Sequence, residues 1–254
     1  MSHQTLRKFK TLYEAPWVVR LATLLITVFM TLILAMFLPL SITFLKANDR
    51  SMVIIIISIG FILSLFGMFY LYRFWKLINP DMTIQKRHES LFTIRKIGLF
   101  IILFLLYIGF QLLVSFLTAD KTISKPSYDI TWVTIVIIWW FNGIVAPIME
   151  ELSMKGVFLS LFFRQPRLYN YISPNISPRL VQMTAGVIAS ALITTMLHGD
   201  ANSFTMLGFL LNGVITAILY YRSSHVFYPI VFHMINNHLV IIGLILYHLG
   251  LLHV

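Results

Sequence analysis

Apolar residues dominate seven runs of this chain, and short polar or charged stretches separate these runs. Each run comes close to or exceeds the roughly 20 residues that an α-helix needs to cross a membrane. The predicted membrane helices are 21–45, 52–78, 97–118, 131–163, 180–197, 204–221 and 226–248. The sequence has none of the alternating apolar and polar segments that build an outer-membrane barrel. The pattern therefore predicts an all-α, polytopic membrane protein with about seven transmembrane helices, within a range of six to eight.

Two of the runs contain features that predict an irregular helix. Pro39 lies near the end of the first run and predicts a kink or a stop, because proline has no backbone N–H to donate. The fourth run, 131–163, is too long for one straight span of about 20 residues. We expect this run to be tilted, broken near Gly143 or Pro147, or extended beyond the membrane.

Lys and Arg are distributed unevenly among the segments between the runs. The N-terminal segment, the 73–96 loop, the 164–179 loop and the Arg222 turn carry most of them. Cytoplasmic segments carry an excess of Lys and Arg, so this distribution predicts a cytoplasmic N-terminus and an external C-terminus. The first apolar run is longer than the core of a signal peptide and lacks a clean cleavage site, so we expect it to be retained.

The composition supports a membrane protein and narrows its chemistry. Charged residues make up 11% and hydrophobic residues 59% of the 254 residues, and the mean hydropathy is +0.87; soluble domains carry about a quarter charged residues. The net charge of +10 comes from basic residues at the ends of apolar runs, so we expect an anionic lipid membrane as the partner, and no nucleic acid. The absence of cysteine from the sequence excludes disulfides and thiolate chemistry.

A pair of adjacent carboxylates interrupts the fourth run. Glu151 and Lys155 are four residues apart with the acid first, which is the favourable order for an ion pair on a helix. Glu150 is turned about 100° away from Glu151 and shares its face with Met154. We expect Lys155 to neutralise Glu151, which leaves Glu150 free to act as a general base on water. A competing interpretation places both acids in the solvated interface at a helix end.

Histidines occur in two later runs. His198 ends the fifth run, and His233 and Asn237 are four residues apart on one face of the seventh. A shared wet cavity inside the membrane would satisfy these side chains together with Glu150. The alternatives are a helix-terminal histidine in the interface and a His–Asn pair that only bonds neighbouring helices. Other single polar residues inside the runs are expected to form interhelical hydrogen bonds; they include Gln111, Asn142 and Asn212.

A carboxylate, two histidines and an amide contain the parts that hydrolysis requires, namely a base, an activator of water and an oxyanion donor. Glutamate and histidine are also zinc ligands, so Glu150, His198 and His233 are a candidate site for zinc or another divalent metal. The zincin motif HExxH is absent from the sequence. The residues themselves leave both a metal-dependent and a metal-independent mechanism open.

Three short motifs carry a resemblance to a known family. They are Glu150-Glu151-x-x-x-Lys155, Thr194-x-x-x-His198 and His233-x-x-x-Asn237. In this order on successive helices they resemble EExxxR, FxxxH and HxxxN of the CAAX-protease and bacteriocin-processing (CPBP, or ABI) family. Members of this family are intramembrane endopeptidases related to the type II CAAX prenyl endopeptidase. The resemblance divides the chain into three N-terminal spans with their loops (1–130) and a catalytic helical core (131–254).

The resemblance implies a role for each motif residue. Glu150 would activate water with the help of His198. His233 and Asn237 would stabilise the oxyanion, and Glu151 would be held by Lys155. The family is described both as metalloproteases and as metal-independent, glutamate-type proteases, so a zinc ion is implied as one of two alternatives.

Two positions depart from the motifs. Lys155 keeps the charge of Arg but loses its bidentate fork, so we expect a looser hold on the carboxylate. Thr194 stands where the motif has Phe, and we expect this change to remove aromatic packing without affecting the chemistry.

The resemblance predicts an intramembrane endopeptidase in a bacterial plasma membrane, acting on a peptide or a membrane protein. Its role would be the maturation of a bacteriocin or pheromone, or self-immunity to a bacteriocin. The two departures favour an alternative, a catalytically silent scaffold or immunity protein that binds a peptide or a sensor kinase. A proton-coupled transporter is a third alternative, and the sequence shows no internal repeat that would support it.

Simple helix lengths place the candidate residues at different depths. Glu150 lies about 28 Å from Thr131 along a straight helix, near the predicted cytoplasmic side. His198 lies about as far from Leu180 on a helix that runs the other way, so it falls near the outer side. The two side chains can meet only if one of the two helices departs from a straight, full span.

Overall fold

The computed structural model describes residues 16–47, 49–78, 92–117, 130–163, 177–198 and 203–251. Within these ranges all regular secondary structure is helical. Seven of the described helical segments are long and apolar enough to cross a membrane. These observations confirm the predicted all-α, polytopic class and the predicted number of spans.

The helices follow the apolar runs closely. Their bounds are α2 (Trp17–Ala35), α3 (Phe37–Lys46), α4 (Arg50–Ile78), α6 (Ile94–Leu117), α7 (Trp132–Ile138), η3 (Trp139–Val145), α8 (Ala146–Glu151), η4 (Leu152–Phe158), α9 (Leu159–Phe162), α10 (Pro178–Leu197), α11 (Ser203–Ser223) and α12 (Phe227–His248). The largest difference from the predicted bounds is at the first span, which begins at Trp17 rather than Leu21.

The first span contains the irregularity that Pro39 predicts, displaced by one turn. The helix is interrupted at Met36, between α2 and α3, and Pro39 lies in the first turn of α3. The missing N–H of a proline removes the hydrogen bond to the carbonyl four residues earlier, which here is that of Ala35. The span is therefore kinked on the N-terminal side of the proline.

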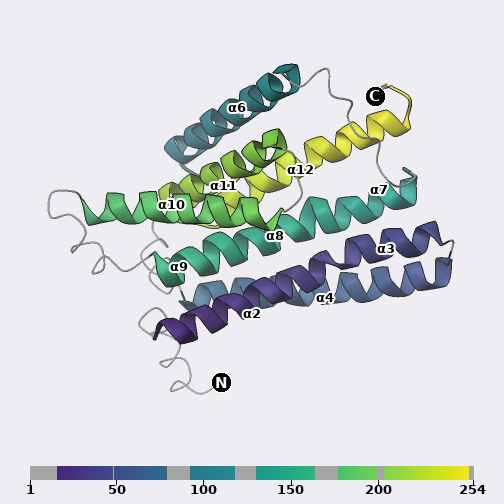
Figure 1. The fold of residues 1–254 in the computed structure, drawn as a ribbon, viewed down its shortest axis with the longest axis horizontal. Coiled ribbons are helices and arrows are strands. Elements are labelled where there is room, and N and C mark those ends of the chain that lie inside the picture. The colour runs from purple at the N-terminus through teal and green to yellow at the C-terminus, as the bar shows by residue number, and fades with distance from the viewer. Residues whose placement is uncertain are drawn as a thin grey trace.

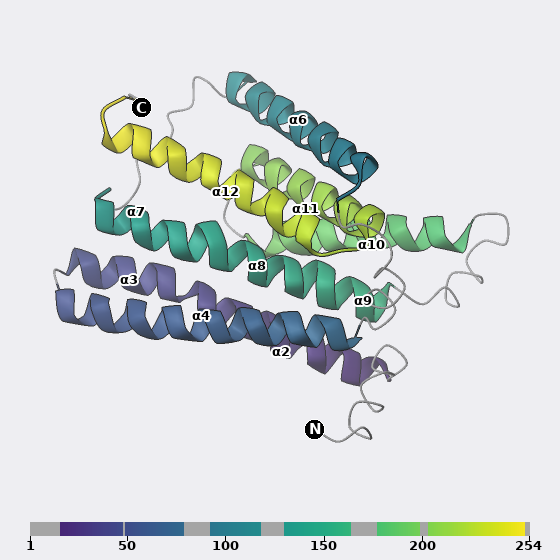
Figure 2. The same cartoon turned by 180° about the vertical axis from the view of Figure 1, so that it is seen from behind.

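The segment from Trp132 to Phe162 comprises α7, η3, α8, η4 and α9, and we call it the central helix. Figures 1 and 2 show α2, α3 and α4 on one side of it and α10, α11 and α12 on the other, with α6 outermost. Half of its membrane-spanning window is buried in the protein, compared with 6% for α6. The central helix is therefore the most buried of the seven candidate spans.

One end of the bundle carries most of the described basic residues. The chain enters α2 and leaves α4, α9 and α11 at this end (Figure 1), and the guanidinium of Arg20 donates to the carbonyl of Leu161 there at 3.0 Å. Arg73, Lys76 and Arg222 lie near the ends of α4 and α11. Most of the 73–96 and 164–179 loops lies outside the described residues. The cytoplasmic location of this end stays a prediction.

The central helix is continuous, which excludes one of the three expected alternatives, a break near Gly143 or Pro147. Instead it contains two π-helical segments, η3 and η4, on either side of the short α8. Pro147 is at the start of α8, and its missing N–H leaves the carbonyl of Gly143 without its usual α-helical donor. The preceding turn accommodates this loss by widening into a π-helix.

The two π-helical segments also explain how side chains spaced by four residues can share one face. In an α-helix each step of four residues turns about 40° more than one full turn, so such a row drifts around the helix. A π-helical turn takes up more residues and offsets this drift. Asn142, Ala146, Glu150 and Met154 consequently face the same pocket.

The position of α10 resolves the difference in depth between Glu150 and His198. α10 extends past the end of the bundle where α9 ends, and its other end reaches only as far as the level of α8 (Figures 1 and 2). His198 directly follows α10 and is thereby brought to the middle section of the central helix. The fifth span has the predicted length, but it is displaced along the bundle axis.

Close packing of α11 holds α10 in this position. A Cβ atom at Gly213 would lie 2.8 Å from the Cα of Ala191 and 3.3 Å from the Cβ of Thr194. Small residues let membrane helices approach this closely. The contact lies one turn before His198, so it also fixes the end of α10.

We expect Gly213→Val to destabilise the protein by about 1–3 kcal/mol, because the backbone of Ala191 cannot move aside without separating α10 from α11. Thermal unfolding in detergent micelles measures the change. Gly109→Val in α6 is the matched control, because a Cβ there meets nothing within 4 Å. Equal stability of the two variants would contradict the close packing described here.

Candidate active site

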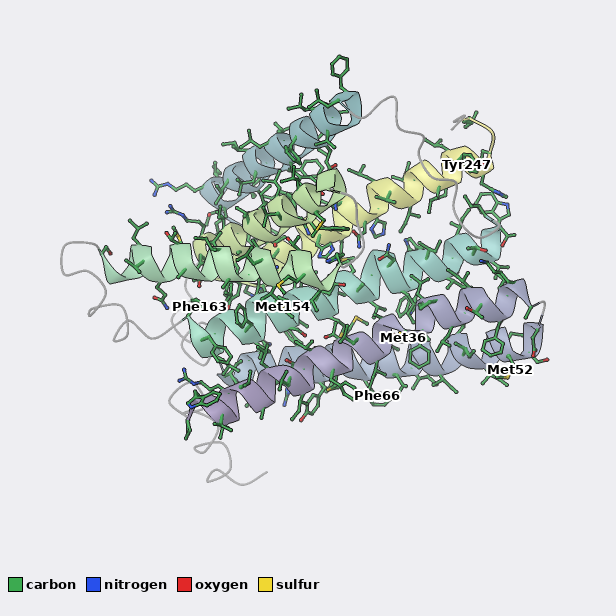
Figure 3. All side chains as sticks on the ribbon, viewed as in Figure 1. Met36, Met52, Phe66, Met154, Phe163 and Tyr247 are labelled. Carbon is green, nitrogen blue, oxygen red and sulfur yellow. The ribbon has the colours of Figure 1, made fainter. Side chains whose placement is uncertain are left out.

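A pocket of about 240 Å³ lies between α2, the central helix and the end of α10. Glu150 and His198 are its two ionisable lining residues. The other lining residues are Val28, Thr31, Leu32, Ala35, Leu38, Phe141, Asn142, Ala146, Met154 and Leu197. Figure 3 shows Met154 well inside the bundle, away from Phe163 at its end. The pocket is therefore partly open and mainly apolar, with a carboxylate and an imidazole on its wall.

Glu150 and Glu151 face different surroundings. Glu150 is partly exposed and lines the pocket, whereas Glu151 is 1% exposed. Within the described ranges no hydrogen bond or ion pair holds the Glu150 carboxylate. The helical spacing had predicted this division between one engaged and one free carboxylate.

His198 is held at the end of α10 by its own helix. The backbone N–H of His198 bonds to the carbonyl of Thr195 at 3.2 Å, so the carbonyl of Thr194 accepts from the ring Nδ1 instead, at 2.7 Å. A carbonyl only accepts, so Nδ1 carries the hydrogen and Nε2 of the neutral ring has a lone pair. The ring also stacks on Phe209 with centroids 4.1 Å apart. Two independent contacts therefore orient this imidazole.

A buried polar network lies behind the pocket and consists of His233, Glu151, Lys155 and Thr194. The two carboxylate oxygens of Glu151 lie 3.0 Å from Nδ1 of His233 and 3.4 Å from Nζ of Lys155. Lys155 also donates to Oγ1 of Thr194 at 3.3 Å. All four residues are at most 5% exposed. The network joins α12, the central helix and α10.

The network confirms one predicted contact and corrects one expectation, which concerns Thr194. The Glu151–Lys155 pair is present, as the four-residue spacing predicted. Lys155 holds the carboxylate through one ion pair of 3.4 Å, and Oε2 of Glu151 accepts no hydrogen bond from the described residues, which fits the expected looser hold of lysine. The threonine at position 194 does more than remove the aromatic packing of the motif Phe, because its hydroxyl is the second partner of Lys155. A sequence pattern cannot show that these two departures contact each other.

His233 and Asn237 lie elsewhere than expected. His233 bonds to Glu151 and is part of the buried network, and it is not among the lining residues of the pocket. Asn237 donates to the backbone carbonyl of Asn142 at 2.7 Å. Asn142 does line the pocket, so Asn237 contacts the pocket wall from behind.

Several pocket residues were not predicted from sequence. Asn142 was expected to form only an interhelical hydrogen bond, although its spacing of eight residues from Glu150 was a usable signal. The wall that α2 and α3 supply had no signal, because its residues, apart from Thr31, are ordinary apolar residues of a membrane helix. Thr31 bonds to Ser153 at 2.9 Å and ties α2 to the central helix.

The three predicted metal ligands do not converge on one point. Among the residues that the structure describes, no group of three His, Asp or Glu side chains is placed to hold a metal ion. Glu150 and His198 share the pocket, whereas the Nδ1 of His233 is engaged by Glu151. A zinc ion at these residues stays a prediction, and no step below is derived through it.

The fold and the pocket together define a polytopic membrane protein with a carboxylate–histidine site between its helices. Residues 132–239 match the family model described as type II CAAX prenyl endopeptidase Rce1-like. For this helical region the match supports the CAAX-protease and bacteriocin-processing family, which is a family of proteases. Neither the curated proteins nor the solved structures include a match to the chain.

The family match and the site cover the same residues. The matched region contains both glutamates, Lys155, Thr194, both motif histidines and Asn237, and it leaves α2, α3, α4 and α6 outside. The pocket nevertheless takes one wall from α2 and α3. The site is thus completed by helices that the family match does not include.

Proposed function

We propose that this protein is an intramembrane endopeptidase in which Glu150 activates the water that attacks the peptide bond. The observation that carries this proposal is the pocket inside the membrane-spanning bundle, which Glu150 and His198 both line. The match to a protease family supports hydrolysis of a peptide. A partly exposed carboxylate that is not held by another side chain is suited to accept a proton from water.

His198 assists Glu150 in this proposal. Its Nδ1–H is committed to the carbonyl of Thr194, so Nε2 accepts a hydrogen bond from the attacking water. Glu150 passes the proton that it took from the water to the leaving amine, and Nε2 takes the other proton of that water and donates it to the same amine, so that both side chains return to their starting protonation. Asn237 bonds to the carbonyl of Asn142 behind the pocket wall, so we propose that it positions this wall; the oxyanion role that the motif implied for it stays a prediction.

His233 and Glu151 support the site from behind the pocket. We propose that His233 holds the Glu151 carboxylate against Lys155, which keeps α12 and the central helix in register next to Glu150. This role replaces the oxyanion contact that the motif resemblance implied for His233.

The biological role that we propose follows from the family resemblance. The substrate is a peptide or membrane protein in a bacterial plasma membrane, and the reaction serves bacteriocin or pheromone maturation or bacteriocin self-immunity. The silent-scaffold alternative was motivated by the Lys155 and Thr194 departures. Their mutual hydrogen bond supports an intact site instead.

The proposed function is tested with the purified protein in nanodiscs of anionic phospholipid, incubated with a pool of apolar peptides whose new termini are identified by mass spectrometry. We expect cleavage by the parent protein and a loss of about 100-fold or more in kcat for His198→Gln, because a positioned acid–base group contributes about 10²- to 10⁴-fold.

His238→Gln is the matched control, because the Nδ1 of His238 bonds to the carbonyl of Met234 at 2.7 Å in the same i to i−4 arrangement, and His238 does not line the pocket. We expect its activity to stay within about two-fold of the parent. Equal activity of His198→Gln and the parent would contradict the proposed role of His198.

A further inference from the structure

The contact between Lys155 and Thr194 connects the buried polar network to the imidazole in the pocket. Lys155 Nζ donates to the Thr194 hydroxyl at 3.3 Å, and the backbone carbonyl of the same threonine accepts from the His198 ring at 2.7 Å. Thr194 is 4% exposed and Lys155 is fully buried. One residue therefore contacts the network with its side chain and His198 with its main chain.

The last turn of α10 needs a side-chain contact that keeps it in place. The carbonyls in the last turn of a helix lack intrahelical donors, and they accept from side chains or from tighter, three-residue bonds. Here the backbone N–H of His198 donates to the carbonyl of Thr195 in the tighter, three-residue bond. The ring Nδ1–H of His198 donates to the carbonyl of Thr194. The direction of that carbonyl decides where the ring lies, so the last turn of α10 must be held still.

Two features hold this turn against the central helix at the level of Thr194. Gly213 packs on the α11 side at the position of Ala191 and Thr194, and Lys155 binds on the side of the central helix. The packing against Gly213 limits translation of α10 but does not select one rotation of its last turn. The hydrogen bond from Lys155 is directional and selects that rotation.

We propose that Thr194 is a positioning residue that couples the Glu151–Lys155 ion pair to the orientation of the His198 ring in the pocket. The proposal rests on the proposed function for its effect on catalysis, but the orientation of the ring is measurable without activity. Thr194 touches no reacting atom. Its hydroxyl acts through Lys155 and its carbonyl acts through His198.

The kinetic test removes only the hydroxyl. Thr194→Val keeps the volume and the β-branch, and we expect kcat for peptide cleavage in nanodiscs to fall by about 10- to 100-fold, because a small misplacement of a catalytic group costs up to about 100-fold. We expect KM to change less than about two-fold, because Thr194 does not line the pocket. Thr194→Ser restores the hydroxyl, and we expect it to recover most of kcat.

Thr195→Val is the matched control. Thr195 is the next residue on α10 and is also buried, and among the described residues its hydroxyl bonds to the carbonyl of Ala191 in its own helix, at 2.9 Å. A merely structural role for buried threonine hydroxyls would lower kcat or stability equally in both valine variants. That result, or a Thr194→Ser variant as impaired as Thr194→Val, would overturn the proposal.

A second measurement separates this proposal from the proposed function. The ¹⁵N spectrum of histidine-labelled protein reports which ring nitrogen carries the hydrogen, and His198→Gln identifies the signal of His198. We expect one Nδ1–H form in the parent, Thr194→Ser and Thr195→Val proteins, and a mixture of forms in Thr194→Val. An unchanged His198 signal in Thr194→Val overturns the proposal. A changed signal, together with a parent protein that cleaves no peptide, supports the coupling and contradicts only the proposed function.

Discussion

Glu150→Gln is expected to lower kcat for peptide cleavage by about 10²- to 10⁴-fold, the contribution of a positioned general base. Gln has nearly the shape of Glu but cannot take a proton from water. Glu150 lines the pocket and is held by no ion pair among the described residues, so we expect the melting temperature to remain within about 2 °C of the parent, as for a change outside the packed core. Cleavage in nanodiscs and thermal unfolding in micelles give the two readouts.

Met154→Leu is the control for this result. Met154 lies four residues after Glu150 and lines the same pocket, and the substitution conserves its volume. We expect its kcat to stay within about three-fold of the parent. A Glu150→Gln protein that cleaves as fast as the parent would exclude Glu150 as the base, whatever the behaviour of Met154→Leu.

Glu151→Leu is expected to destabilise the protein by about 3–5 kcal/mol, because it leaves the buried ammonium of Lys155 without its counter-ion. Lys155 is fully buried, and its second partner, the Thr194 hydroxyl, carries no charge. The double variant Glu151→Leu/Lys155→Met removes both charges, and we expect it to recover most of this loss. Equilibrium unfolding in mixed detergent micelles measures the difference.

Glu150→Leu is the matched control for stability, since it is the same substitution at the adjacent residue. The Glu150 carboxylate lines the pocket and forms no ion pair with the described residues. We therefore expect the free energy of unfolding to change by less than about 1 kcal/mol. If Glu151→Leu and Glu150→Leu were equally stable, or if the double variant were less stable than Glu151→Leu, the buried ion pair would not have the proposed structural importance.

The membrane architecture was predictable from the chain alone. An apolar run long enough to span a membrane must form a helix there, because lipid offers no partners for backbone N–H and C=O groups. This local requirement explains why the seven predicted spans match the helices so closely. The same reasoning predicted the Glu151–Lys155 contact, because residues four apart meet on one helix whatever surrounds it.

Predictions that assumed a regular helix failed where the backbone departs from one. A break at Gly143 or Pro147 was one of three alternatives expected for the central helix, which widens into π-helical turns instead. A proline shows that a hydrogen bond is lost, but it does not show how the chain adapts. The row from Asn142 to Met154 faces one pocket only because of that adaptation.

The sequence by itself determined the seven spans, the division of labour between Glu150 and Glu151, and the three motifs of the protease family. Only the tertiary structure decided which groups meet between helices. It displaces α10 so that His198 reaches the level of α8, it pairs His233 with Glu151, and it places α2 against the pocket. Hydropathy and spacing act within one helix, whereas the offset of one helix against another depends on close contacts such as Gly213 with Ala191, which no periodicity in the sequence records.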